Sequence, residues 1–209
     1  MRVEQLALGA LQTNCYIIYN QDKCIIVDPG GDAGKIIDWI SQNQSQPLVI
    51  LLTHAHFDHI GAVDEIRMKY EVPVYVHQNE AEWLLNPSLN GSQLFFPNSV
   101  VRTKQADHFI MGEGDFQMDE FTFRIFETPG HSPGSISFYN EEFQFVIAGD
   151  ALFNGSIGRT DLPGGDYETL IKSIKTKLLT LPEETIVFPG HGPRTTIKRE
   201  KLVNPFLQS

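Results

Sequence analysis

Four potential metal ligands stand within six residues, in the segment Thr53-His54-Ala55-His56-Phe57-Asp58-His59. This segment directly follows Leu48–Leu52, an uninterrupted apolar run of strand length. A turn at a strand end lets neighbouring side chains point inward together, without the fixed spacing that a helix imposes. Imidazole nitrogens and carboxylate oxygens are the ligands that zinc and similar divalent ions prefer. The segment therefore predicts part of a metal site.

Three further candidate ligands each follow a strand-like run. His131 and His191 both stand in Pro-Gly-His segments, and Asp150 ends the apolar run Phe143–Gly149. The neighbouring Gly or Pro allows the backbone to turn sharply at each position. Seven candidates, five His and two Asp, exceed the four ligands of one tetrahedral ion and fit two ions that share a carboxylate.

Four other residues have a less specific context. We interpret His77 and His108, which are isolated on or beside strands, as locally hydrogen-bonded histidines rather than ligands. Asp28 and Thr53 each stand at a strand end, where they can orient the ligand segment or equally cap a turn. The sequence leaves these two roles open.

The elements that must position these residues alternate between strands and helices. Strands are predicted at 14–19, 24–28, 48–52, 72–76, 121–126, 135–139, 143–148 and 185–188, and helices at 33–40, 62–70 and 167–178. Residues 86–104 are rich in Pro, Gly, Asn and Ser and are predicted to form a long irregular loop. Trp83, Leu84, Leu85, Phe95 and Phe96 can either cover a site as a lid or belong to the core. We predict an α/β fold, an αββα sandwich of two mixed β-sheets flanked by helices.

Composition indicates a globular protein with a small-molecule partner. The chain has 209 residues, 41% of them hydrophobic, and we expect one domain over residues 1–209. A net charge of −10 without a basic run argues against nucleic-acid binding, and no apolar run approaches the roughly 20 residues of a membrane span. Cys15 and Cys24 would lie about 13 Å apart on the predicted hairpin, too far for a disulfide. Reduced thiols and the absence of an export pattern in residues 1–19 predict a cytoplasmic location.

The chain resembles the metallo-β-lactamase-fold hydrolases from about residue 13 to residue 206. The resemblance lies in His54-x-His56-x-Asp58-His59, Pro-Gly-His131, Gly149-Asp150 and Pro-Gly-His191. It implies one metal held by His54, His56 and His131. It implies a second held by Asp58, His59 and His191, with Asp150 bridging the two. The two divalent ions are expected to be zinc, with iron or manganese as alternatives.

A second set of residues is similar to short bacterial glyoxalase II-like enzymes, which resemble hydroxyacylglutathione hydrolases. This set comprises Leu152–Asp161, Gly190–Thr196 and the ending Asn204-Pro205-Phe206. The resemblance implies a thioesterase that cleaves S-lactoylglutathione or a similar acyl-thiol through a hydroxide bridging two metals, with Asp58 orienting the hydroxide or taking its proton. Full-length enzymes of this type carry a further helical C-terminal region that binds glutathione, and we expect this chain to lack it.

Arg159 follows the bridging Asp150 at a place that resembles that of a glutathione-contacting basic residue in related enzymes. Its guanidinium can clamp a substrate carboxylate. The alternative is a salt bridge with Asp161 or Asp166.

Other functions on the same scaffold also remain open. A mononuclear-iron persulfide dioxygenase shares the His-x-His-x-Asp-His and Gly-Arg-Thr-Asp stretches, but the complete second ligand set argues against it. A lactonase is a further alternative. The expected cytoplasmic location disfavours a β-lactamase, and the length and charge of the chain disfavour a nuclease. A non-catalytic metal-binding module is disfavoured because the ligand set is complete.

Overall fold

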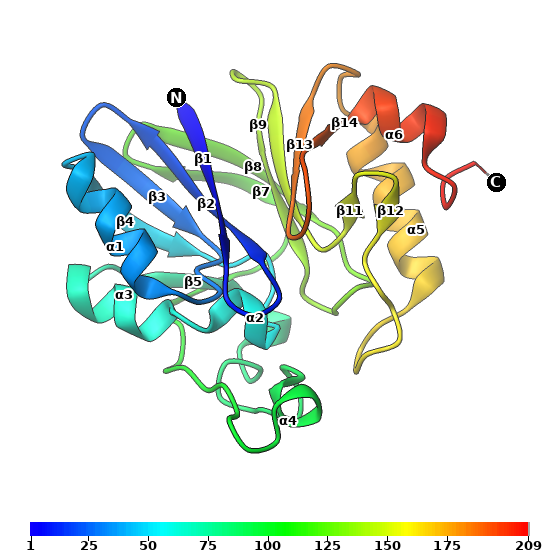
Figure 1. Ribbon diagram of the computed structural model, residues 1–209. Helices are drawn as coiled ribbons and strands as arrows, with labels where there is room; N and C mark the ends of the chain where they lie inside the picture. The colour runs from blue at the N-terminus through cyan, green and yellow to red at the C-terminus, as the bar shows by residue number, and fades with distance from the viewer. Residues whose placement is uncertain (209) are drawn as a thin grey trace. The chain divides into compact units, whose positions relative to one another are not determined.

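The computed structural model describes residues 1–208, which divide into two compact units, Met1–Met111 and the chain from Gly112 onward. Each unit contains a six-stranded sheet that is partly parallel and partly antiparallel, together with helices (Figure 1). The prediction of two mixed sheets is therefore confirmed. No helix within residues 1–208 combines the length and the apolar character needed to cross a membrane.

The sheet of the first unit has the strand order β1-β2-β3-β4-β5-β6. Its first three strands pair in antiparallel fashion, and β3 to β6 pair in parallel. Tyr19 lies opposite Cys24, as the predicted hairpin requires. Because parallel strands end at one edge of a sheet, the residues that follow β3 and β4 meet at that edge. The strands are β1 (Arg2–Leu8), β2 (Thr13–Asn20), β3 (Lys23–Val27), β4 (Gln46–Leu51), β5 (Val74–His77) and β6 (His108–Ile110).

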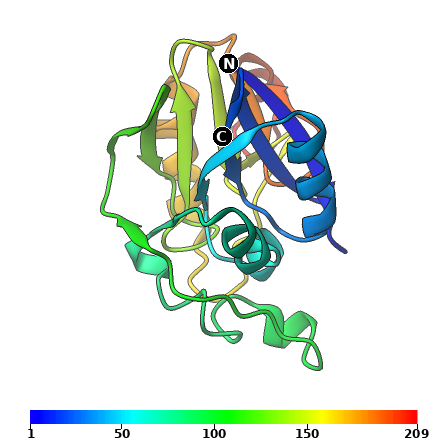
Figure 2. The same cartoon turned by 90° about the vertical axis from the view of Figure 1, so that its left-hand side faces the viewer.

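The helices of the first unit pack their apolar faces into the same core as the sheet. Ile36 and Ile40 of α1 and Ile66 of α3 belong to one buried cluster with Ile26 and Ile50 of the strands. Both views place α4 in a segment that projects away from the sheet of its unit (Figure 1 and Figure 2). The helices are α1 (Ala33–Gln42), α2 (Phe57–Ile60), α3 (Val63–Tyr70), the 3-10 turn η1 (Gln78–Glu80) and α4 (Ser92–Phe95).

The sheet of the second unit has the order β14-β13-β10-β9-β8-β7, in which only β10 and β13 are parallel neighbours. Leu170 and Ile174 of α5 share a buried cluster with Val146 and Val187 of these two strands. The elements are β7 (Gly114–Met118), β8 (Phe121–Glu127), β9 (Ile136–Asn140), β10 (Phe145–Gly149), β13 (Ile186–Pro189), β14 (Thr195–Thr196), the hairpin β11 (Leu152–Phe153) and β12 (Ser156–Ile157), α5 (Tyr167–Thr176), η2 (Leu178–Thr180) and α6 (Ile197–Val203).

Several short elements were not predicted. In the edge strand β7, Phe116 and Met118 alternate with exposed polar residues, but two partly buried side chains in five residues are too weak a signal to predict a strand. Helix α6 is capped by Thr196, whose side chain accepts a hydrogen bond from the Arg199 amide, but the helix spans only seven residues. Within the predicted loop at 86–104, Ser92–Phe95 forms the single turn α4. These elements depend on pairing and capping more than on apolar periodicity.

Candidate metal centre

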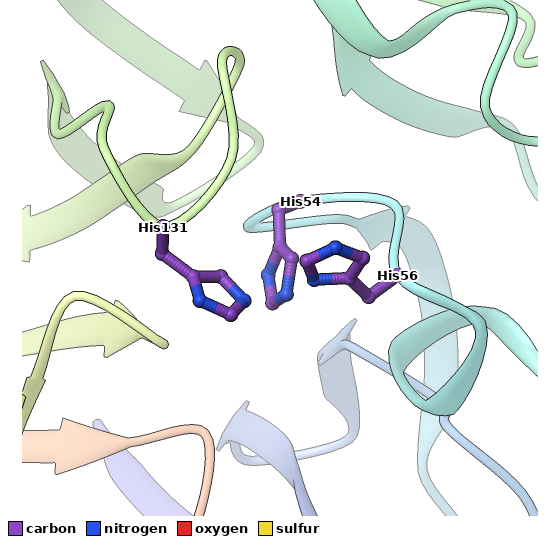
Figure 3. A group of neighbouring side chains, drawn as sticks. All are labelled: His54, His56 and His131. Atoms are coloured by element: carbon purple, nitrogen blue, oxygen red, sulfur yellow. The ribbon is translucent and has the colours of Figure 1, made fainter. Parts of the chain in front are cut away.

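The ligand segment of the first unit leaves the end of β4 and continues into the short helix α2. The side chains of His54, His56 and His59 are buried, and Asp58 is partly exposed. Figure 3 shows His54 and His56 projecting from this segment, with His131 on the loop that follows β8. The ring centroids of His54 and His59 lie 4.0 Å apart. Three buried imidazoles on one turn form a concentration of ligand atoms that hydrogen bonding alone does not explain.

A single carboxylate, that of Asp28, fixes two of these rings. Its Oδ2 accepts a hydrogen bond from His59 Nδ1 at 2.9 Å and from Thr53 Oγ1 at 2.6 Å. The Thr53 hydroxyl oxygen in turn lies 3.1 Å from His54 Nδ1. Since Thr53 Oγ1 donates its proton to Asp28, it accepts from His54, so both rings carry their proton on Nδ1.

This arrangement leaves the Nε2 lone pairs of His54 and His59 available to a metal, which is the usual effect of a carboxylate behind a ligating histidine. Asp28 itself lies within 4.8 Å of the ligand atoms of both histidines. Its oxygens are committed to Thr53 and His59, however, because Oδ1 also accepts from the Thr53 amide at 2.8 Å. Of the two roles that the sequence left open, the structure places Asp28 and Thr53 in orienting positions.

Two more residues support the segment, and sequence analysis missed both. Glu80 is fully buried and accepts a hydrogen bond from the Ala55 amide, between the first two histidines, at 2.5 Å. Thr13 donates its hydroxyl proton to Asp58 Oδ2 at 2.7 Å. Neither residue belongs to a motif, since each reaches the segment from a strand or turn that is distant in sequence.

The second unit brings three predicted ligands together around one oxygen. Asp150 Oδ2 lies 3.5 Å from His131 Nε2 and 3.5 Å from His191 Nε2. These separations are longer than an ordinary hydrogen bond. They match the distance of roughly 3.4 Å that separates two ligand atoms when each lies about 2.1 Å from the same tetrahedral ion. The same relation holds in the first unit, where His59 Nε2 and Asp58 Oδ2 are 3.6 Å apart. Since β10 and β13 are parallel, Asp150 and His191 follow strand ends at one edge of the sheet.

The backbone of Arg159, rather than its side chain, supports this group. His131 Nδ1 donates to the Arg159 carbonyl oxygen at 2.7 Å, which again leaves the Nε2 lone pair for a metal. The exposed Arg159 guanidinium instead forms two hydrogen bonds to Asp161, at 2.7 and 2.8 Å. This pairing lowers the pKa of Asp161 to about 2 and raises that of Arg159. Of the two sequence interpretations of Arg159, the structure contains the salt bridge with Asp161.

Two glycines allow the ligand loops to approach other backbone. A Cβ at Gly30 would lie 1.8 Å from the Asp58 carbonyl oxygen. A Cβ at Gly158 would lie 1.8 Å from the Asp150 carbonyl oxygen and 3.1 Å from His131 Nδ1. Neither position tolerates a side chain without movement of a candidate ligand.

The remaining predicted residues separate into two groups. His77 accepts a hydrogen bond from the Asn79 amide, which agrees with its interpretation as a locally hydrogen-bonded histidine. The exposed His108 ring packs on the Tyr75 ring, with 4.5 Å between the ring centroids. In the aromatic-rich segment, Trp83 and its neighbour at position 84 belong to the core. The side chains at positions 85, 95 and 96 are exposed.

The donor set in each unit fits a divalent metal. Imidazoles whose Nδ1 protons are held by carboxylate, hydroxyl or carbonyl oxygens, next to carboxylates at ligand spacing, are typical of zinc, iron and manganese sites. Buried polar groups of this kind are not needed for packing the apolar core.

The class of protein that this fold and these ligand groups define is confirmed by comparison with known families. Residues 8–191 match the Metallo-beta-lactamase superfamily, and the chain belongs to that superfamily. Its fold is accordingly the α/β metallo-β-lactamase fold, as predicted. Members of the superfamily bind divalent metals, and the chain is a metallo-hydrolase of this group.

Individual relatives cover essentially the whole chain. Probable metallo-hydrolase YqgX of Bacillus subtilis is 51% identical, over 99% of this chain and 98% of its own length. Hydroxyacylglutathione hydrolase GloC of Haemophilus influenzae is 41% identical, over 100% of this chain and 99% of its own length. Among solved structures, BLEG-1 B3 metallo-beta-lactamase superposes with a TM-score of 0.97 at 50% identity, covering 100% of both chains. TTHA1623 in a di-iron-bound form superposes with a TM-score of 0.84 at 39% identity, covering 98% of this chain and 100% of its own length.

Proposed function

We propose that the protein is a two-metal thioesterase of the glyoxalase II type, which hydrolyses S-lactoylglutathione or a similar acyl-thiol. The observation that carries the proposal is the position of Asp150 Oδ2, 3.5 Å from the Nε2 atoms of both His131 and His191. An oxygen equally distant from two ligand nitrogens is suited to bridging two ions. The similarity to GloC over the full length of both chains supports the acyl-thiol substrate.

The proposed ligands divide as the family resemblance implies. His54, His56 and His131 would hold one ion, Asp58, His59 and His191 would hold the other, and Asp150 would be shared between them. Zinc is the proposed metal, with iron and manganese as alternatives, and the di-iron form of TTHA1623 supports keeping iron among them. When bound, two such ions polarise an acyl carbonyl and lower the pKa of a nearby water.

The chain's own residues then position and protonate the reactants. Thr13 donates to Asp58 Oδ2, and His59 Nε2 faces the same oxygen. We assign to Asp58 Oδ1 the uptake of the proton from the attacking water. The remaining OH of the water adds to the thioester carbon, the C–S bond breaks, and the departing sulfur takes up the proton held by Asp58 to give a carboxylic acid and a thiol.

Arg159 has a second role in the proposal, as the residue that binds a substrate carboxylate. It must exchange its two hydrogen bonds to Asp161 for two to the substrate. We further propose a cytoplasmic location, which the two buried, unbridged thiols of Cys15 and Cys24 support. Neither a membrane nor a nucleic acid is a proposed partner.

The test measures metal content together with hydrolysis of S-lactoylglutathione. We expect about two metal ions per chain and thioesterase activity, which Asp58→Ala lowers by about 10² to 10⁴. Asp38→Ala is the matched control, because Asp38 is exposed on α1. One iron per chain, oxygen consumption with glutathione persulfide and no thioester hydrolysis would instead establish a dioxygenase.

One finding favours a second candidate function, the hydrolysis of β-lactams. The solved structure with the 0.97 TM-score is described as a B3 metallo-beta-lactamase. Both reactions place water on an acyl carbon, so the ligand set does not distinguish them. Parallel assays with nitrocefin and S-lactoylglutathione separate the two, and a kcat/KM higher for nitrocefin would replace the thioesterase by a β-lactamase. Ring opening of an acyl-homoserine lactone in the same assays would indicate a lactonase.

A further inference from the structure

A small apolar pocket adjoins Asp58 in the first unit. Its volume is about 170 Å³, and Leu8, Leu11, Phe57, Phe96 and Val101 contribute apolar side chains to its lining. Within residues 1–208, Asp58 is the only charged residue among those that line the pocket. The pocket therefore opens an apolar volume next to the residue that we assign to proton uptake.

Glycines make this volume available. Gly9, Gly30 and Gly61 line the pocket with backbone, and a Cβ on Gly61 would lie 2.4 Å from the Gly30 carbonyl oxygen. The close approach of these backbones leaves the space beside them free of side chains. The pocket is thus a consequence of the same tight turns that position the ligand segment.

Two exposed apolar residues contribute to the lining from the surface. Leu11 is 47% exposed and Phe96 is 38% exposed. Contact of apolar side chains with water is energetically unfavourable. Phe96 is held by an edge-to-face contact with Phe57, whose ring centroid lies 5.5 Å away. A rigid aromatic ring beside an exposed leucine suits a ligand that covers both.

The size and charge of the pocket indicate which part of a thioester substrate it can bind. A cavity of about 150 Å³ is large enough for benzene, so this pocket accepts a phenyl or branched C4 group. Glutathione is much larger and carries two carboxylates, whose burial against the apolar lining would be costly. The pocket consequently fits the acyl arm rather than the leaving thiol.

We propose that this pocket is the acyl subsite and that the preferred substrates are thioesters with an apolar aromatic or branched acyl group. This inference rests on the proposed thioesterase function. Burial of the acyl arm against Leu11 and Phe96 holds the thioester carbon beside Asp58. The preference lies in the acyl group, independent of the leaving thiol.

The test compares S-mandeloylglutathione with S-lactoylglutathione, which share one leaving thiol. We expect the wild-type kcat/KM to be about tenfold higher for the mandeloyl substrate. Ala10→Trp, which fills the pocket from an exposed position on its lining, should reverse this ratio. Phe96→Ala should reduce the ratio, and Leu94→Ala, exposed on α4 outside the pocket, should leave it unchanged.

A binding measurement makes the test independent of turnover. In the zinc-loaded protein, phenylacetamide should shift the ¹H–¹⁵N NMR signals of the Gly9, Gly30 and Gly61 amides, and Ala10→Trp should abolish the shifts. Hydrolysis of both thioesters with a ratio that neither variant changes would overturn the acyl subsite alone, as would the absence of shifts. Failure of the fully metal-loaded wild type to hydrolyse either thioester would refute the proposed function and the acyl assignment with it.

Discussion

Asp28 controls the protonation of two histidines, so its replacement by asparagine should weaken metal binding without unfolding the chain. Asp28→Asn keeps the shape of the side chain but offers one acceptor oxygen where the carboxylate offers two. If that oxygen accepts from the Thr53 amide, an NH₂ group faces the protons of His59 Nδ1 and Thr53 Oγ1. The rings then favour the tautomer protonated on Nε2, which competes with metal binding.

The magnitude follows from the hydrogen bonds that Asp28 Oδ2 accepts. Loss of a group that orients a ligating histidine lowers metal affinity by about 10- to 100-fold, which corresponds to about 1.4 to 2.7 kcal/mol. Because Asp28 is 1% exposed, water does not replace the lost acceptor. We expect the effect to fall on His54 and His59 together, since the Thr53 hydroxyl links them to one carboxylate.

The assay is competition for zinc between the protein and a chromophoric chelator, with the far-UV circular dichroism of the variant as the check on folding. Asp32→Asn is the matched control, because Asp32 lies four residues away and its partly exposed carboxylate binds Lys35 rather than a histidine. Its zinc affinity should change by less than about twofold. Equal zinc affinities for a folded Asp28→Asn protein and the wild type would refute the tautomer argument.

Three further perturbations test other parts of the structure. Glu80→Ala removes the acceptor of a buried amide and should lower the free energy of unfolding by about 1 to 3 kcal/mol in urea, and Glu80→Gln, which keeps an acceptor oxygen, should recover most of it. Gly158→Ala forces a Cβ against the Asp150 carbonyl and should reduce metal content by mass spectrometry, whereas Gly34→Ala, with open space around it, should not. Burial raises the pKa of the Cys24 thiol from 9.0 to about 11, so stability that is complete below about pH 9 should decline as the pH rises through about 11. The alkaline decline in melting temperature should be shallower in Cys24→Ala, and an identical pH profile would contradict this assignment.

The sequence indicated the candidate ligands because each one follows a strand with a local signal. His54, His56 and His59 come directly after the apolar run of β4, and His131 and His191 each follow a Pro-Gly turn at a strand end. Apolar runs and sharp turns are local properties, so they can be recognised without knowledge of the fold. The same reasoning predicted both mixed sheets.

Short elements were beyond local reasoning. The hairpin β11–β12 consists of two-residue strands, too short for any periodicity. It is fixed by the buried Glu200, whose carboxylate accepts hydrogen bonds from the Gly155 amide and from the Asn204 side chain. A glutamate on a short helix that binds a distant loop has no local signature.

The composition and order of the candidate ligands were therefore determined by the sequence alone, and their orientation was decided by the tertiary structure. Asp28 reaches His59 across 31 residues, and Glu80 reaches the amide of Ala55 across 25. The pocket beside Asp58 likewise depends on which backbones approach one another. The physical reason is that a side-chain hydrogen bond depends on position to within a few tenths of an ångström. Such positions are set by the packing of whole sheets and helices and not by neighbouring residues.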